Sequence, residues 1–167
     1  MENREDAIQR LIDRAEIVET VHLYATGVDT KNFELYRSIF ADEIEVDFSS
    51  YIPDSGPMTI AADLWVASIK PLFVGLDATQ HSMSNARVEI KGDHATCVMY
   101  MQAEHFLAND QGDSSHTVGG YYTNELVRLP EGWRLKKVKL TVLWQRGNRD
   151  VMTLGAERGS GLLQGGS

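Results

Sequence analysis

Three side chains in this sequence could transfer a proton, and the apolar residues around them indicate where they face. Alternate residues from Ala95 to Ala103 form the apolar face of a predicted strand, and His105 continues that face. Asp29 ends a helical face that is otherwise apolar apart from His22. An imidazole can accept a proton near neutral pH, and a neighbouring carboxylate can orient it. Together with His81, these residues are candidates for acid–base chemistry.

The residues alone also allow plainer interpretations. His81 shares a face of its strand with Met83, but the apolar residues in the later part of that strand lie on the other face, so periodicity does not bury His81. His105 could be a core histidine with a backbone partner, or a residue at the rim of the sheet. Asp29 could end its helix in a solvated turn, where a negative charge is otherwise unfavourable. His22 is better explained by helix packing than by catalysis.

The elements that must position these residues are helical in the first half of the chain. Apolar residues recur every three or four positions from Ile8 to Val28, which predicts a helix with one buried face. The following segments are predicted as a turn over 29–32, a short helix over 33–40, a strand over 44–48, a loop over 52–57, and a third helix from Thr59 towards Ile69 that Pro71 and Gly75 end.

The second half of the chain is predicted to consist of consecutive strands joined by turns. Because hairpin-connected strands run antiparallel, we expect an antiparallel sheet. Helices followed by such a sheet indicate an α+β fold. We expect a cone-shaped α+β barrel, with N-terminal helices packed on a strongly curved sheet that encloses a pocket. The predicted strands cover residues 79–91, 94–107, 115–129 and 133–145.

Composition limits the partners of this 167-residue, 18.7 kDa chain. Its length fits one domain over residues 1–147, followed by a glycine-rich tail over 148–167 that we expect to be flexible or to contact another subunit. A net charge of −8 disfavours nucleic acid and anionic membranes as partners, and no apolar run approaches the ~18 residues of a membrane span.

Two further features concern the compartment. The N-terminus lacks the apolar stretch of a signal peptide, and the lone Cys97 forms no intrachain disulfide. We therefore expect a cytoplasmic protein.

Short motifs in a fixed order resemble the SnoaL-like branch of the nuclear transport factor 2-like superfamily, which contains scytalone dehydratase and hexachlorocyclohexane dehydrochlorinase. They span roughly residues 8 to 145. The motifs are Ile17-Val18, Tyr24-Ala25, Val28-Asp29, Asn32-Phe33, Phe40-Ala41-Asp42, Thr79-Gln80-His81, Tyr122-Thr123-Asn124-Glu125-Leu126 and Gly132-Trp133-Arg134-Leu135.

The resemblance implies a catalytic dyad of Asp29 and His81, with His105 as a second active-site histidine. His81 would remove a proton from carbon, Asp29 would hold its tautomer and stabilise the imidazolium, and His105 or a tyrosine would protonate a departing hydroxyl or polarise a carbonyl. The tyrosine that adjoins the aspartate in scytalone dehydratase is Val28 here, and Tyr24, one helical turn earlier, could replace it. We expect no metal and no cofactor.

Strand parity and the resemblance together predict the wall of the pocket. Methionine-rich walls adapt to flat or irregular apolar ligands, so we expect a small hydrophobic substrate that is cyclic or resembles a polyketide, terpenoid or steroid. The predicted substrate-binding residues are Phe48, Tyr51, Trp65, Met83, Met99, Met101, Tyr122, Val138, Leu140 and Trp144.

These expectations favour a cofactor-independent lyase that catalyses a dehydratase-like elimination. An isomerase or cyclase with the same dyad is the alternative within the enzymes. A non-catalytic ligand-binding or structural protein, such as the small subunit of a ring-hydroxylating dioxygenase, is the alternative outside them, because this fold also serves as a scaffold. We expect a homodimer or homotrimer.

Overall fold

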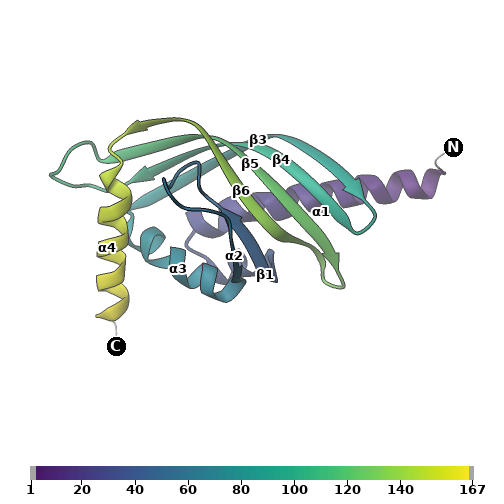
Figure 1. Ribbon diagram of the computed structural model, residues 1–167, viewed down its shortest axis with the longest axis horizontal. Helices are drawn as coiled ribbons and strands as arrows, with labels where there is room; N and C mark the ends of the chain where they lie inside the picture. Colours follow the sequence, from purple (N-terminus) through teal and green to yellow (C-terminus); the bar gives the residue numbers. More distant parts are fainter. Residues whose placement is uncertain (1–2, 166–167) are drawn as a thin grey trace.

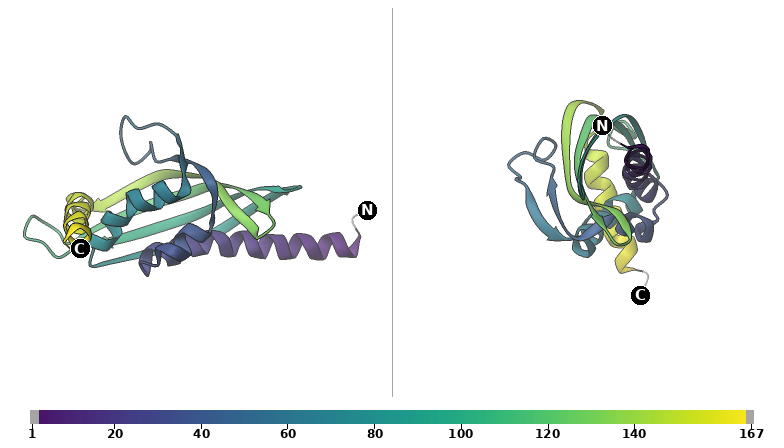
Figure 2. Two further views of the ribbon diagram at one scale, coloured as in Figure 1. Left: turned by 90° about the horizontal axis from the view of Figure 1, so that it is seen from below. Right: turned by 90° about the vertical axis from the view of Figure 1, so that its right-hand side faces the viewer.

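A strongly curved, six-stranded sheet forms the body of the computed structural model, which describes residues 3–165 (Figures 1 and 2). The sheet does not close on itself, and helices lie against its inner face. The four long strands pair antiparallel as expected, whereas β1 pairs with β6 in parallel. In spatial order the strands are β2 (Met58–Ala61), β1 (Phe40–Asp47), β6 (Gly132–Gly147), β5 (Ser115–Leu129), β4 (His94–Phe106) and β3 (Ala78–Lys91).

Within residues 3–165, four helices complete the α+β fold that the sequence predicted. The third helix begins later than expected because residues 58–61 pair with β1 as an edge strand, and it continues through Pro71 to Gly75. Asn3 caps the first helix by accepting the backbone N–H of Asp6. The helices are α1 (Arg4–Asp29), α2 (Phe33–Ser38), α3 (Ala62–Gly75) and α4 (Asp150–Gln164).

Apolar packing and an ion pair in its first half fix the helix α1 to the sheet. Ile17 and Val28 are completely buried in the main core. Asp13 accepts two hydrogen bonds from the guanidinium of Arg128, at 2.6 and 2.7 Å, and that guanidinium stacks on Trp133. The Arg128 hydrogen bonds lower the pKa of Asp13 to about 2, although burial opposes the charge. The ion pair thereby sets how α1 lies along the hairpin of β5 and β6.

A β-bulge in β3 explains why strand periodicity did not predict that His81 faces the inside of the sheet. Register with β4 shifts between Ser84 and Arg87, and Asn85 has a positive φ of 56°. The extra residue reverses which face the following side chains occupy. His81 and Met83 before the bulge, and the apolar residues after it, therefore all face inward, although a strict period of two puts them on opposite faces.

The C-terminal segment is a packed helix, so the expectation of flexibility was wrong for residues 148–165; positions 166 and 167 lie outside the described residues. Its glycines, which indicated a loose chain, allow α4 to lie directly on α3 (Figure 1). A β-carbon at Gly159 would collide with the Pro71 carbonyl oxygen, and one at Gly75 would collide with the carbonyl of Gly155. Contact with another subunit remains a prediction.

The glycine contact gives a test of this helix pair. We expect Gly159→Ala to lower the free energy of unfolding by about 1–3 kcal/mol, because the added methyl group forces the two backbones apart. Gly161→Ala in the same helix is the matched control: a β-carbon there meets nothing within 4 Å, so it should stabilise the protein by about 0.5–1 kcal/mol. Urea unfolding measures both, and equal effects at the two positions would contradict the packing.

Candidate active site

An apolar cavity of about 210 Å³ lies between the inner face of the sheet, α1, α3 and the loop that connects β1 to β2. We call this connection, residues 48–57, the rim loop. Its exposed residues Ile52, Ser55 and Gly56 line the cavity. The deeper wall is aromatic and aliphatic, and its few polar groups belong to histidines and tyrosines. Such a cavity is suited to a small apolar ligand.

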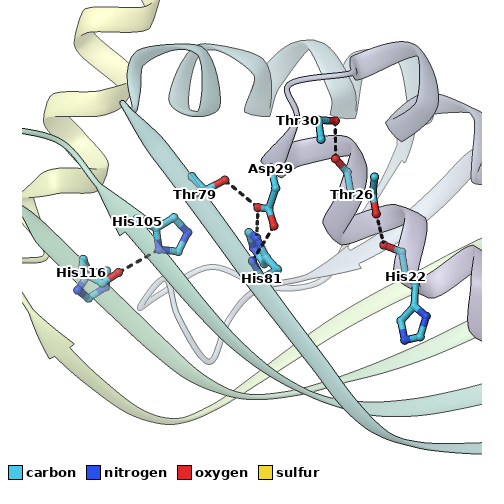
Figure 3. A network of polar contacts seen from close by, with 8 residues as sticks. All are labelled: His22, Thr26, Asp29, Thr30, Thr79, His81, His105 and His116. Carbon is cyan, nitrogen blue, oxygen red and sulfur yellow. Dashed lines mark hydrogen bonds and ion pairs between the residues drawn. The ribbon is translucent and has the colours of Figure 1, made fainter.

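The carboxylate of Asp29 and the imidazole of His81 meet at the wall of this cavity (Figure 3). Asp29 is the last residue of α1, and β3 brings His81 opposite it. The distance from His81 Nδ1 to Asp29 Oδ1 is 2.7 Å. The backbone N–H of His81 donates to Oδ2 at 2.7 Å, and the hydroxyl of Thr79 donates to Oδ1 at 2.7 Å. Three donors from one strand therefore orient a single carboxylate.

These hydrogen bonds determine the charge and the tautomer of the pair. Burial disfavours the charge of Asp29, but the hydrogen bond and the charge of His81, followed by the backbone N–H of His81 and the Thr79 hydroxyl, outweigh burial and lower the pKa of Asp29. An ionised carboxylate only accepts, so His81 donates from Nδ1. In the neutral form of this ring, Nε2 carries a lone pair. The His81 side chain is 4% exposed and the Asp29 side chain 19%, so the pair is largely shielded from water.

His105 also borders the cavity, but as a fixed hydrogen-bond acceptor. Its Nδ1 lies 3.2 Å from the backbone oxygen of His116, so Nδ1 carries the proton. Burial, and then the charge of His81, lower the pKa of His105 to about 4. A neutral ring with its proton on Nδ1 presents a lone pair at Nε2. The expectation that His105 protonates a leaving group therefore has no support in this arrangement, because the ring offers the cavity no proton.

Tyrosines provide the hydroxyl groups of the deeper wall. Tyr24 and Tyr122 are buried and border the cavity, with ring centroids 5.2 Å apart. Tyr36 lies 5.0 Å from Tyr24 and accepts a hydrogen bond from Nε1 of Trp65 at 3.1 Å. Burial raises the pKa of all three tyrosines, so each remains a protonated hydroxyl at neutral pH. Tyr24 is thus placed where a ligand could meet it.

The structure brings most of the predicted wall residues to the cavity, but not all of them. Met99 and Val138 are buried in the core, and Met83 packs against it, because the helix α1 covers this part of the sheet. The predicted residues that border the cavity are Tyr24, Phe48, Tyr51, Trp65, His81, Met101, His105, Tyr122 and Leu140.

The prediction that Trp144 faces the pocket is wrong, because β6 contains a bulge before this residue. Gly120 pairs with Val142 and Gly119 with Trp144, so Leu143 is an extra residue that reverses the alternation. The indole of Trp144 lies against Gly119, where a β-carbon would collide with it, and the residue is 44% exposed. It therefore belongs to the outer face of the sheet.

Several cavity residues escaped the sequence prediction. Ile69 and Leu72 follow Trp65 at helical spacing, so a helical period applied to α3 could have found them. Met152 lies on α4, where the glycine content hid the helix. No periodicity would reveal these contacts of α4, since they depend on how two helices pack.

Within residues 3–165, no group of three or more His, Cys, Asp or Glu side chains is arranged to hold a metal ion. Cys97 is buried, and burial raises its pKa to about 11, so it remains a thiol rather than a reactive thiolate. In the same part of the chain, no helix has the length and apolar character needed to span a membrane.

A curved, open sheet with an acid–base pair at the wall of an apolar cavity defines a pocket-containing α+β fold. The SnoaL-like domain matches residues 9–139, and the chain belongs to this family. The resemblance drawn from the sequence motifs is thereby confirmed. The Kfla4162 protein from Kribbella flavida is 35% identical over 87% of this chain and 98% of its own, with a TM-score of 0.79.

Two more distant structures share the fold. A candidate scytalone dehydratase from Novosphingobium aromaticivorans is 18% identical over 86% of this chain and 92% of its own, with a TM-score of 0.75. A type 2 hexachlorocyclohexane dehydrochlorinase is 21% identical over 85% of this chain and 93% of its own, with a TM-score of 0.71. The comparison with curated proteins found no match.

The protonation of His105 can be measured directly. Because burial and the charge of His81 oppose its protonation, we expect the His105 ring to stay neutral from pH 8 to pH 5 and to titrate near pH 4. ¹⁵N NMR of the ring should show the proton on Nδ1, and the spectrum of His105→Gln would assign the signal. A midpoint near the ordinary value of 6.5, or a proton on Nε2, would contradict the acceptor assignment.

The lowered pKa of His105 also makes the free energy of unfolding depend on pH. Below pH 6.5 the unfolded chain binds a proton at this histidine before the folded chain does. His105 should therefore make the protein less stable as the pH falls towards 4.

Proposed function

We propose that this protein is a cofactor-independent lyase that eliminates water from a small hydrophobic cyclic substrate. The observation that carries the proposal is the 2.7 Å hydrogen bond between Asp29 and His81 at the wall of an apolar cavity. The cavity volume of about 210 Å³ lies below the ~300–1,000 Å³ typical of drug-sized ligands, which favours small ring compounds over a steroid.

His81 is the base in this proposal. Its Nε2 lone pair takes a proton from the carbon next to a substrate carbonyl, and the ring becomes an imidazolium. The ionised Asp29 stabilises that positive charge and keeps the ring in place. The hydroxyls of Tyr24 and Tyr122 stay protonated and hydrogen-bond to neighbouring tyrosines, and either can turn to donate to the carbonyl oxygen as negative charge develops there. No further base is needed.

The proton that His81 removes is also the proton that the leaving group needs. In a β-hydroxy carbonyl substrate, the C–H and C–O bonds break, a C=C bond forms, and His81 returns its proton to the departing hydroxyl, which leaves as water. His105 accepts a hydrogen bond from that hydroxyl through Nε2 and so holds it near His81, since the ring centroids are 5.7 Å apart. Both histidines end in the state in which they began.

The main alternative keeps the same base. An isomerase or cyclase would use Asp29 and His81 to form the same enolate but would expel no water. The acceptor Nε2 of His105 favours elimination, because it fits a substrate that carries a hydroxyl hydrogen beside the reacting carbon. A purely structural protein, such as a dioxygenase small subunit, would have no use for the oriented base.

Turnover of cyclic β-hydroxy ketones tests this proposal. We expect enone formation, followed by ultraviolet absorbance, in the wild-type protein, and a loss of roughly 10²–10⁴-fold in kcat/KM for His81→Ala and for Asp29→Asn. His22→Ala is the matched control: this histidine of α1 points away from the Asp29–His81 pair and does not border the cavity (Figure 3). It should keep wild-type activity.

Two results would overturn the assignment. One is unchanged activity in His81→Ala. The other is binding of the ketones without any enone, with every variant folded as judged by circular dichroism; detection of a rearranged product instead would establish the isomerase or cyclase.

A further inference from the structure

The helix α4 forms part of the cavity although it lies beyond residues 9–139, the part of the chain that the family matches. Met152 is its contribution to the wall. Figure 1 shows α4 standing across the end of the sheet where β3 begins and β4 ends. His81 and His105 belong to those same ends of their strands. The helix thus closes the cavity at the end that holds the polar groups.

Three contacts fix the position of α4. Its glycines pack directly on the backbone of α3. Arg158 pairs with Asp77 at 2.8 Å, just before β3. At the start of the helix, Arg149 donates to the backbone oxygen of Tyr51 at 2.6 Å, and its guanidinium stacks on that ring at 4.9 Å. A helix held at its start, at its middle and along one side presents the side chains of its first turns at constant positions.

Tyr51 connects the start of α4 with the histidines. Its hydroxyl lies 3.3 Å from Nε2 of His116, and the rings of His116 and His105 are 6.2 Å apart. Met152 follows Arg149 by three residues, about one helical turn. Met152 and Tyr51 both line the cavity, and Tyr51 is linked to the His105 ring through His116.

We propose that Met152 is a specificity-determining residue that limits the bulk a ligand can carry next to the hydroxyl bound by His105. The thioether fills this corner of the cavity, so a ligand with hydrogen beside its hydroxyl fits and one with a branched group there does not. The inference shares with the proposed function only the premise that the cavity binds ligands and that His105 accepts a hydroxyl; it requires no turnover.

Substituted phenols measure this limit by binding alone. Isothermal titration would compare phenol with 2-tert-butylphenol, whose bulk lies next to the hydroxyl, and with 4-tert-butylphenol, whose bulk lies opposite. In the wild type, we expect the 2-substituted compound to bind more weakly than the 4-substituted one. Met152→Ala should shift the ratio of the two Kd values at least tenfold towards the 2-substituted compound, since each buried methylene contributes roughly fourfold in affinity.

Two further variants separate selectivity from general damage. Met152→Leu keeps nearly the same volume, so it should retain the wild-type ratio. Leu163→Ala removes a half-exposed apolar side chain from the same helix, away from the cavity, and should leave the ratio unchanged.

The outcomes distinguish this inference from the proposed function. An unchanged ratio in folded Met152→Ala overturns the role of Met152, whatever the protein does to β-hydroxy ketones. The expected shift in the ratio of Kd values without any ketone turnover supports the role of Met152 and contradicts the proposed lyase activity. Failure of every phenol to bind overturns the inference as well, because it rests on a hydroxyl-accepting cavity.

Discussion

The site depends on a negative charge at a helix end that ordinarily repels it. Asp29 terminates α1, where the exposed carbonyl groups make an anion unfavourable. Donors outside the helix stabilise the carboxylate there, and β3 provides them through the His81 backbone, the His81 ring and Thr79. The end of α1 and the start of β3 must therefore meet, and this requirement links the helical half of the chain to the sheet.

That meeting is possible because the sheet curves and its strands contain bulges. The bulge at Asn85 allows β3 to place His81 toward the cavity and still bury its later apolar residues. Because of the bulge at Leu143, the side chain of Leu140 in β6 points inward, whereas that of Trp144 lies on the outer surface. Each bulge reverses the face on which the following side chains lie. One strand therefore lines the cavity in one part and contributes to the core or the surface in another.

The sequence predicted those features that depend on long, regular patterns. The four long strands, the first helix and the inward face ending in His105 follow from simple periodicity, and the partnership of Asp29 with His81 came from the resemblance of short motifs. Periodicity failed at single residues that break a pattern, as at Trp144. It also failed for α4, because glycine indicates flexibility when read alone, whereas Gly75, Gly155 and Gly159 act together by removing the atoms that would separate two helices.

The hydrogen-bond directions in the cavity have a chemical consequence that no sequence pattern contains. Asp29 fixes the proton of His81 on Nδ1, and the His116 carbonyl does the same for His105. Both rings border the apolar cavity with their centroids 5.7 Å apart, and in its neutral form each carries a lone pair at Nε2. An acceptor that a bound ligand shields from water needs a donor in exchange. A ligand meets this need only if it brings hydrogens of its own, and an acidic C–H beside a hydroxyl group satisfies both nitrogens at once.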